Sequence, residues 1–389
     1  MDQPWSPAPA PTVVGIIGHE KHGKTTLFRA LLRRQASRVP APASLLGSWY
    51  APPLWSRFTT TGAPWLLVDC LGPEFNVLSD SLTTLDGVIL IVAADRGVEA
   101  RTRETLLLAR QAGVRSVLVF LSRTDQVAEA QVIDRVEIAV RQLLNQLEYP
   151  GDDVPVIQGN VQSAAESDDL DDHTCRALEE LLSSLDLTVR PSPRDPEAPL
   201  LLPVARGDYS ILDGHVIVQG RVARGRVRPG QLVELPCAHP KRTQLLVDKI
   251  WFFGQPWSEA GPGHAVQLRL VLPPGSAAKL PFINPAQVVA EPGSIHPRRR
   301  FRAQLSVTAR GEGKGARSLR MGMRPSFWLG TSRIRGRITE APGNSLAPGS
   351  TGVVAVELDW PCFIQVGQLL ACRHRNAVIA HGHVEALLR

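Results

Sequence analysis

Apolar residues in the first half of the chain fall into short runs that amphipathic stretches separate. Runs rich in Val, Ile and Leu predict buried strands, whereas apolar positions at helical spacing predict helices. The strands are predicted at residues 13–17, 65–69, 87–93, 116–121 and 154–157, and the helices at residues 24–36, 98–112, 130–148 and 171–185. This alternation indicates an α/β fold with a doubly wound parallel sheet. Residues 37–61 contain four prolines and no period, and they predict a long surface loop.

The second half of the chain has a different pattern. From residue 200 onward, short β-rich segments alternate with Gly and Pro turns, and no helix-period stretch occurs. Two sets of such strands predict two small β barrels, at residues 200–291 and 292–389. Residues 191–199 contain four prolines and predict a stiff linker behind an α/β domain at residues 12–190. Residues 1–11, rich in Pro and Ala, predict a flexible tail.

Composition limits the class of protein. An apolar fraction of 43% and a charged fraction of 21% are ordinary for a soluble protein. No apolar run reaches the length of a membrane span, and the first residues lack an export pattern, so we expect a cytoplasmic protein without membrane contact. The cysteines are odd in number and scattered, which favours a reducing compartment without disulfides. They are Cys70, Cys175, Cys237, Cys362 and Cys372.

The net charge of +6 is unevenly distributed along the chain. Residues 292–389 contain 15 Lys and Arg against 5 Asp and Glu, which leaves the remainder of the chain slightly acidic. A basic segment of this kind is typical of a protein that binds nucleic acid, here RNA. An arginine-rich but merely solvated surface remains the alternative.

A phosphate-binding loop is predicted between the first strand and the first helix. The stretch Gly-His-Glu-Lys-His-Gly-Lys-Thr-Thr has the glycines, the lysine and the threonine that such a loop requires. Backbone N–H groups and the positive end of the following helix favour phosphate oxygens there. We expect Lys24 to reach the outer phosphates and Thr25 to bind Mg²⁺. The predicted nucleotide-binding residues are Gly18, His19, Glu20, Lys21, His22, Gly23, Lys24, Thr25 and Thr26.

Polar residues also follow three later strands, at the sheet edge where such folds bind ligands. Asp69 is expected to act on Mg²⁺, and Gly72 to meet the terminal phosphate. The segment Ser122-Arg123-Thr124-Asp125 offers a carboxylate that accepts hydrogen bonds from the two N–H donors of guanine, which adenine lacks. Asp125 as a plain helix cap is the alternative. Backbone N–H groups at Asn160 and Val161 are expected to meet the guanine oxygen.

These motifs resemble translational GTPases, and most closely the elongation factor Tu family. The resemblance rests on the loop at residues 18–26, Asp69-Cys70-x-Gly72 and the segment 119–125, with later anchors at residues 220–225, 292–297, 324–327 and 348–349. It implies a P-loop GTPase domain followed by two β barrels, which binds GTP or GDP with Mg²⁺. It also implies a monomeric switch that carries aminoacyl-tRNA to the ribosome, with a nucleotide exchange factor as a further partner.

Several positions depart from the family pattern. Pro73 replaces the histidine that positions the attacking water, so no catalytic residue is assigned and weakened hydrolysis is expected. The loop before residue 56 is shorter than the family's first switch, and Thr59 to Thr61 are expected to form a hairpin turn. Ser122 and Arg123 replace Asn and Lys, and Asn160 replaces a serine. Lys21 replaces an aspartate, and its ammonium either occupies a monovalent-cation position or is simply solvated.

The positions that hold the 5′ end of the tRNA in the family are also changed. They correspond to Leu78, Ser79 and Pro285, so two charges and an amide are lost. Each lost phosphate contact weakens RNA binding, and only the arginines of the last barrel remain as a substitute. Three interpretations therefore stay open. The first is a working RNA-carrying GTPase, and the second is a hydrolysis-deficient GTP-binding regulator or specialised carrier. The third, which has less support, is a structural partner of the ribosome that needs no nucleotide.

Overall fold

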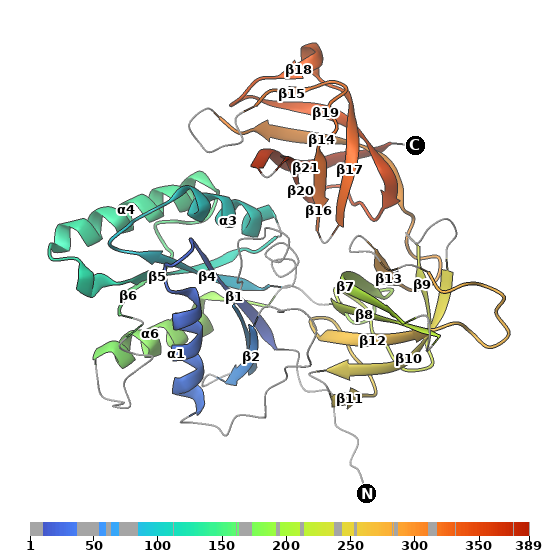
Figure 1. The fold of residues 1–389 in the computed structure, drawn as a ribbon, viewed down its shortest axis with the longest axis horizontal. Helices are drawn as coiled ribbons and strands as arrows, with labels where there is room; N and C mark the ends of the chain where they lie inside the picture. Colours follow the sequence, from blue (N-terminus) through green and yellow to red (C-terminus); the bar gives the residue numbers. More distant parts are fainter. Residues whose placement is uncertain are drawn as a thin grey trace, which may run out of the picture. The chain divides into compact units, whose positions relative to one another are not determined.

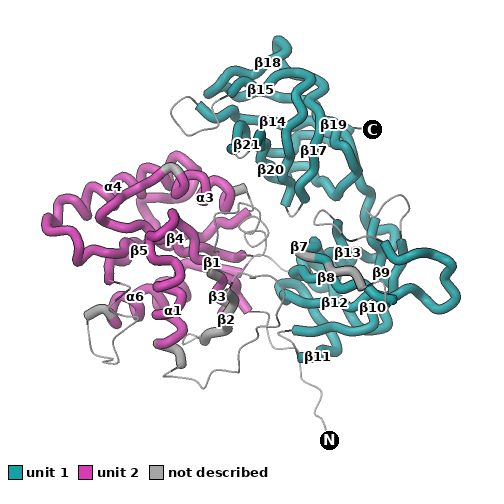
Figure 2. The backbone as a smooth tube through the Cα atoms, in the orientation of Figure 1, with its two compact units in different colours: residues 1–10, 193–389 teal, residues 11–192 magenta. Residues whose placement is uncertain are grey.

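We describe the protein from a computed structural model. The described residues fall into two compact units, one within residues 11–192 and one within residues 193–389 (Figure 2). The described ranges are 11–36, 54–59, 64–69, 85–111, 113–160, 162, 173–191, 195–210, 214–236, 243–252, 255–281, 283, 287–309, 317–330, 332–375 and 377–388. Among these residues, no helix has both the length and the apolar character needed to cross a bilayer.

The first unit is built on a six-stranded sheet in the order β2-β3-β1-β4-β5-β6 (Figure 1). All neighbouring strands run parallel except β2 and β3, which form an antiparallel hairpin. The strands are β1 (Thr12–Gly18), β2 (Leu54–Thr59), β3 (Pro64–Asp69), β4 (Gly87–Ala93), β5 (Ser116–Ser122) and β6 (Val156–Gln158). Strands β1 and β4 are buried along their whole length, as expected for a sheet covered on both faces.

Helices cover both faces of this sheet (Figure 1). They are α1 (Lys24–Ala36), α3 (Ala100–Gln111), α4 (Ala130–Gln146) and α6 (His173–Thr188). Leu27 and Leu31 of α1 and Leu181 of α6 pack in one cluster with every second residue of the central strands, such as Ile89 and Ile91. The expected α/β fold with a doubly wound sheet is confirmed, and α1 directly follows the turn that β1 enters.

The sequence-based prediction for residues 37–61 is wrong in its last part. Residues 54–59 form β2, which pairs with β3 from Leu54 opposite Asp69 to Thr59 opposite Pro64. Pairing with the neighbouring strand β3 orders this segment, although it lacks a long apolar run of its own. The other predicted elements are present, with ends that shift by a few residues; for example, the helix predicted at residues 98–112 begins at Ala100.

The second unit begins with a barrel whose closed ring has six antiparallel strands, while β11 pairs with β10 outside the ring. The sheet runs β11-β10-β12-β8-β7-β13-β9, and an additional pairing of β10 with β9 closes the ring. Its strands are β7 (Leu201–Ser210), β8 (His215–Arg221), β9 (Leu232–Leu235), β10 (Thr243–Phe252), β11 (Gln255–Trp257), β12 (Ala265–Val271) and β13 (Val288–Ala290). Inward residues alternate along the strands, as in β12, where Val266, Leu268 and Leu270 are buried.

A second closed barrel follows in the order β14-β19-β17-β16-β20-β21, in which β21 returns to pair with β14. Its strands are β14 (Arg298–Val307), β16 (Ser326–Leu329), β17 (Ser332–Glu340), β19 (Thr351–Cys362), β20 (Leu369–His374) and β21 (Ala377–Leu388), and a small ribbon pairs β15 (Leu319–Arg320) with β18 (Ser345–Leu346). Both predicted barrels are therefore confirmed. Cys175, Cys362 and Cys372 are buried, and burial raises the pKa of Cys372 far above its usual range.

Tryptophan rings pack into both barrels. Trp328 on β16 is 8% exposed, and the guanidinium groups of Arg333 and Arg373 lie 4.9 and 4.5 Å from its ring centre. Phe252 packs against the core of the first barrel and lies 4.4 Å from the ring of Trp257. These rings stabilise the barrels through apolar burial and cation–π contact.

Candidate functional site

The turn between β1 and α1 has the backbone shape of a phosphate-binding loop. Gly18 adopts φ +146°, and a Cβ atom there would lie 2.3 Å from the carbonyl oxygen of Ile91. Gly23 adopts φ +100°, and Lys21 lies in the left-handed region at φ 61°. Only glycine fits at residue 18, since any side chain would collide with β4. The loop can therefore curl tightly beside the carboxyl end of β4 before α1 begins at Lys24.

The Lys24 ammonium group is held over this loop. Its Nζ donates to the main-chain oxygen of Gly18 at 3.0 Å and to that of His19 at 2.7 Å. These bonds place the cation on the rim of the turn, where backbone N–H groups and the start of α1 also favour an anion. Thr25 follows half-buried in the first turn of α1. The predicted residues of the loop thus come together as one anion-binding feature.

His22 is fully buried beneath the loop. Its Nδ1 accepts a hydrogen bond of 3.2 Å from the N–H of Ala93, and its Nε2 points toward Glu99, 3.5 Å from Oε1. Burial lowers the pKa of His22, although Glu99 acts in the opposite direction by favouring the charged ring. His19 lies on the other side of Glu99, with 2.7 Å between Nε2 and Oε2. The sequence had assigned both histidines to the loop but had not identified Glu99.

The segment after β5, for which base recognition was predicted, is tied directly to the loop. Ser122 Oγ donates to the carbonyl oxygen of His22 at 2.8 Å, and Arg123 Nη2 donates to that of Lys21 at 2.5 Å. Arg123 itself adopts φ 58° and also contacts Asp95 at 3.3 Å. The two residues that depart from the family pattern therefore both bind main-chain oxygens of the phosphate loop.

Asp125 lies beside this link, within the short helix η1 (Thr124–Gln126). Its side chain is exposed, so the carboxylate is accessible to a ligand. The next strand end is close in the sheet, because the N–H of Gly159 donates to the oxygen of Leu121 at 3.0 Å. Asn160 follows, and its Oδ1 accepts a hydrogen bond of 2.9 Å from the N–H of Gln162. Asn160 thus stabilises the turn after β6.

For Asp69, the second predicted Mg²⁺ ligand, the structure describes the position of the backbone. Asp69 is the last residue of β3 and lies opposite Ile16 of β1 in the parallel pairing, two residues before Gly18. Other positions assigned or discussed from the sequence lie outside the described residues. These are Gly72, Pro73, Leu78, Ser79, Val161 and Pro285, together with residues 1–10.

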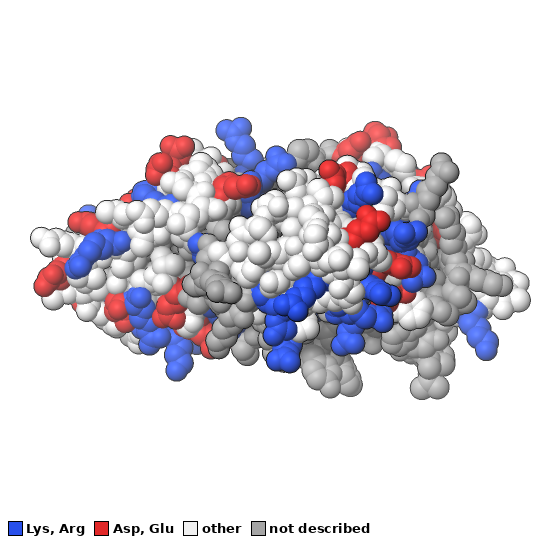
Figure 3. Space-filling model, turned by 90° about the horizontal axis from the view of Figure 1, so that it is seen from above, with Lys and Arg blue, Asp and Glu red and all other residues white. Residues whose placement is uncertain are grey.

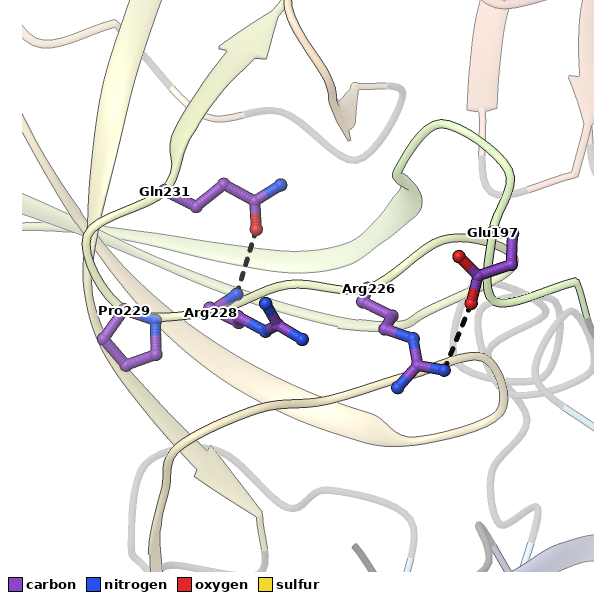
Figure 4. A pocket seen from close by; sticks show the side chains of 5 residues that line it. All are labelled: Glu197, Arg226, Arg228, Pro229 and Gln231. Atoms are coloured by element: carbon purple, nitrogen blue, oxygen red, sulfur yellow. Dashed lines mark hydrogen bonds and ion pairs between the residues drawn. The ribbon is translucent and has the colours of Figure 1, made fainter.

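A cavity of about 570 Å³ lies elsewhere, in the first barrel (Figure 4). Its lining residues are Glu197, Arg226, Arg228, Pro229 and Gln231. Carboxylates already engage both arginines: Arg226 contacts Glu259 at 2.8 Å and Glu197 at 3.3 Å, and Arg228 also binds Glu259. Hydrogen bonding from Arg226 lowers the pKa of Glu259. None of these residues was predicted as a site, and the paired charges make the cavity a poor anion trap.

The second barrel carries the exposed arginines that the sequence predicted. Arg300, on β14, and Arg337, on β17, both lie opposite Glu357 on the intervening strand β19. Arg302 contacts Glu340 at 3.6 Å, and Arg299 contacts Glu357 at 3.7 Å. Acidic and basic side chains are intermixed on the face shown in Figure 3. The outer surface of this barrel is therefore basic but interrupted by carboxylates.

One comparison with known proteins bears on this site. Residues 57–191 match the family model of the elongation factor Tu GTP binding domain. The matched stretch contains Asp69 and the segment from Ser122 to Asp125, and it begins after the phosphate loop. The match supports a GTP-binding domain of the translational GTPase kind. Together with the two closed barrels, it gives the chain an elongation-factor-like architecture.

Proposed function

We propose that this chain is an elongation factor Tu-like GTP switch of translation, which carries aminoacyl-tRNA or a related RNA to the ribosome and hydrolyses GTP slowly. The observation that carries the proposal is the pair of hydrogen bonds from Ser122 and Arg123 to the carbonyl oxygens of His22 and Lys21. A base-reading segment that is fixed to a phosphate-binding loop selects a ligand with both parts, a nucleotide. The same proposal includes a monomeric protein in the cytoplasm and a nucleotide exchange factor that acts on it.

Asp125 reads the base in this proposal. Its exposed carboxylate lies two residues after Arg123 in sequence and accepts hydrogen bonds from the two N–H donors of guanine. Val161, with Asn160, provides main-chain donors for the guanine oxygen. Thr25 and Asp69 are the proposed Mg²⁺ ligands, since a hydroxyl and a carboxylate offer the oxygen atoms that this ion prefers. The ion supplies charge neutralisation of the phosphates.

Nucleotide binding is tested by calorimetry on the full chain after removal of bound nucleotide. The Lys24→Ala variant removes the ammonium that Gly18 and His19 hold, and we expect its GDP affinity to fall by at least about a hundredfold. Lys279→Ala is the matched control, because it removes an exposed lysine from the first barrel. Equal affinity for GDP and ADP, or no uptake of either by the unmodified chain, would contradict the proposal.

RNA cargo is supported by the exposed arginines of β17. Arg335 and Arg337 point outward from the barrel, on the same face of the strand. We expect Arg335→Ala combined with Arg337→Ala to weaken tRNA binding and to lower the slope of log affinity against log salt by about 2. The matched control replaces the exposed Arg115 and Arg135 of the α/β domain. Filter binding with charged and uncharged tRNA measures both variants, and an unchanged salt slope would exclude this surface.

Slow hydrolysis is supported by Pro73, since proline has no side chain that could position water. The same residue favours a second candidate function, a GTP-binding regulator or specialised carrier that does not act in general elongation. Single-turnover GTP hydrolysis with and without ribosomes separates the two. Ribosome-stimulated turnover favours the slow carrier, whereas hydrolysis that ribosomes do not accelerate favours the regulator.

A further inference from the structure

The two histidines of the phosphate loop share one carboxylate. Glu99 Oε2 lies 2.7 Å from His19 Nε2, and Oε1 lies 3.5 Å from His22 Nε2. The imidazole rings are 5.1 Å apart, and His22 is fully buried. The three ligand atoms lie within 4.8 Å of one another, a spacing that a transition-metal ion would tolerate. The hydrogen-bond partners of each ring decide whether this cluster holds a metal or protons.

His22 has the wrong tautomer for a metal. The N–H of Ala93 donates to Nδ1, so Nδ1 carries no hydrogen, and the proton of the neutral ring is on Nε2. Burial lowers the pKa of this ring and favours the neutral form. A metal bound at Nε2 would displace this proton. The ring would then be an imidazolate, or its proton would lie on Nδ1 and face the N–H of Ala93. Nε2 instead faces Glu99, 3.5 Å from the nearer carboxylate oxygen.

His19 lies on the other side of Glu99. Its Nδ1 lies 3.0 Å from the carbonyl oxygen of Glu20, which only accepts hydrogen bonds, and its Nε2 lies 2.7 Å from Glu99. Both ring nitrogens of His19 therefore face oxygen atoms. Glu99 thus lies between the two histidines, with one carboxylate oxygen near the Nε2 of each ring.

Glu99 is itself held at the start of α3. The N–H of Thr102 donates to the Glu99 carbonyl at 2.9 Å, and the Glu99 N–H donates to Thr102 Oγ1 at 3.4 Å, as in a helix N-cap. Two residues later, Arg101 binds Glu20 at 2.7 Å. The first turn of α3 therefore holds residues 19, 20 and 22 of the phosphate loop through side chains.

We propose that Glu99 is a positioning residue for nucleotide binding, whose carboxylate holds His19 and His22 and thereby keeps the loop in its binding shape. This inference rests on the proposed function, in which residues 18–26 hold the phosphates. A loop that is shaped in advance loses less conformational freedom when the ligand arrives. Glu99 contacts the histidines and not the ligand, so it acts on affinity through the backbone of the loop.

Binding of fluorescent GDP by the full chain tests the proposal. We expect Glu99→Gln to weaken binding by about tenfold, because an NH₂ group replaces one of the two carboxylate oxygens that face the histidines. The side chain of Glu99 is 31% exposed, so the isosteric amide should leave the melting temperature nearly unchanged. Glu148→Gln is the matched control, since Glu148 contacts Arg110 on the same domain, away from the loop. We expect His19→Gln, alone or combined with Glu99→Gln, to give a similar and not a doubled loss.

A second measurement reports on the protons directly. In long-range ¹H–¹⁵N spectra of the histidine rings, we expect His22 as the Nε2–H tautomer. One equivalent of Zn²⁺ that converts His22 to the Nδ1–H form would overturn the proposal, as would Glu99→Gln protein that binds GDP like the unmodified chain. If the unmodified chain binds no guanine nucleotide, the proposed function fails, and so does the role of Glu99 in nucleotide binding. Spectra that show the expected tautomer of His22 would still support the shared position of the Glu99 carboxylate.

Discussion

Ser122 Oγ donates a hydrogen bond of 2.8 Å to the carbonyl oxygen of His22, a residue 100 positions earlier in the chain. The bond is buried and joins the end of β5 to the phosphate loop. We expect Ser122→Ala to raise the dissociation constants of GDP and GTP by a similar factor of about 5 to 10, because the bond stabilises the loop whichever nucleotide is bound. Calorimetry measures both constants.

Ser183→Ala provides the matched control for this variant. Ser183 also donates from its hydroxyl to a main-chain oxygen, that of Glu179, but from an exposed position on α6. Its loss should leave both constants unchanged. A Ser122→Ala protein that binds GDP normally and loses only GTP affinity would show that the link serves the terminal phosphate, contrary to our interpretation.

Asp125 offers a test of base choice. An amide in place of its carboxylate presents donors as well as an acceptor, and xanthine carries a carbonyl where guanine has its amino group. We expect Asp125→Asn to weaken GDP binding by about a hundredfold and to strengthen binding of xanthosine diphosphate. Competition against fluorescent GDP compares the two bases. Unchanged preference for guanine would assign Asp125 to the helix start alone.

His22 predicts a pH dependence of stability. Burial lowers its pKa below the ordinary value of 6.5, so the unfolded chain binds this proton more readily than the folded chain. The free energy of unfolding should therefore fall as pH drops below about 6.5, by up to about 1.4 kcal/mol per pH unit from this group. Glu99 opposes the effect, whereas His19 and Lys24 add to it. Urea unfolding at pH 7.5, 6.5 and 5.5 measures the slope.

The contribution of His22 is isolated with the His22→Asn variant. Asn keeps an acceptor for the Ala93 N–H and cannot titrate. Its stability should change less between pH 7.5 and 5.5 than that of the unmodified chain. Parallel curves for the two proteins would show that other groups cause the acid destabilisation.

Glu259 predicts a second acid effect, in the first barrel. Hydrogen bonding from Arg226 lowers the pKa of Glu259 below its ordinary value of 4.5. The stabilisation is present above pH 4.5 and is lost as pH falls through the lowered pKa. We expect Glu259→Gln to reduce the melting temperature at pH 7 by about 2 to 4 °C and to have little effect near pH 3. Calorimetric scans at both pH values test this, and an equal reduction at both would attribute the loss to packing.

Local patterns explain why much of the fold could be predicted from the sequence. Runs such as residues 87–93 are apolar at every position because β4 is covered on both faces, and alternation such as residues 265–271 follows from one buried face of β12. The phosphate loop could be identified because its glycines, Lys24 and Thr25 are adjacent in the chain. Each of these signals depends on a few neighbouring residues.

Long-range contacts explain what could not be predicted. Strand β2 is the exception, since it pairs with the neighbouring strand β3 and was missed because residues 54–59 carry no distinctive pattern. Glu99 looked like an ordinary helix-start residue, and its role depends on two histidines about 80 positions earlier. Ser122 and Arg123 replace Asn and Lys of the family pattern, and the sequence did not show that both side chains bind the loop. A hydroxyl and a guanidinium reach these carbonyls only in the folded sheet.

The position of β21 in the second barrel has a consequence for how this barrel folds during synthesis. Strand β21 pairs with both β14 and β20, and it is synthesised after the other strands of this barrel. Until it emerges, two strands of the nascent barrel present unsatisfied edges that can pair with other chains. The α/β domain can fold during translation, whereas this barrel can close only after β21 has emerged. Chaperones can bind the unpaired strand edges in that interval.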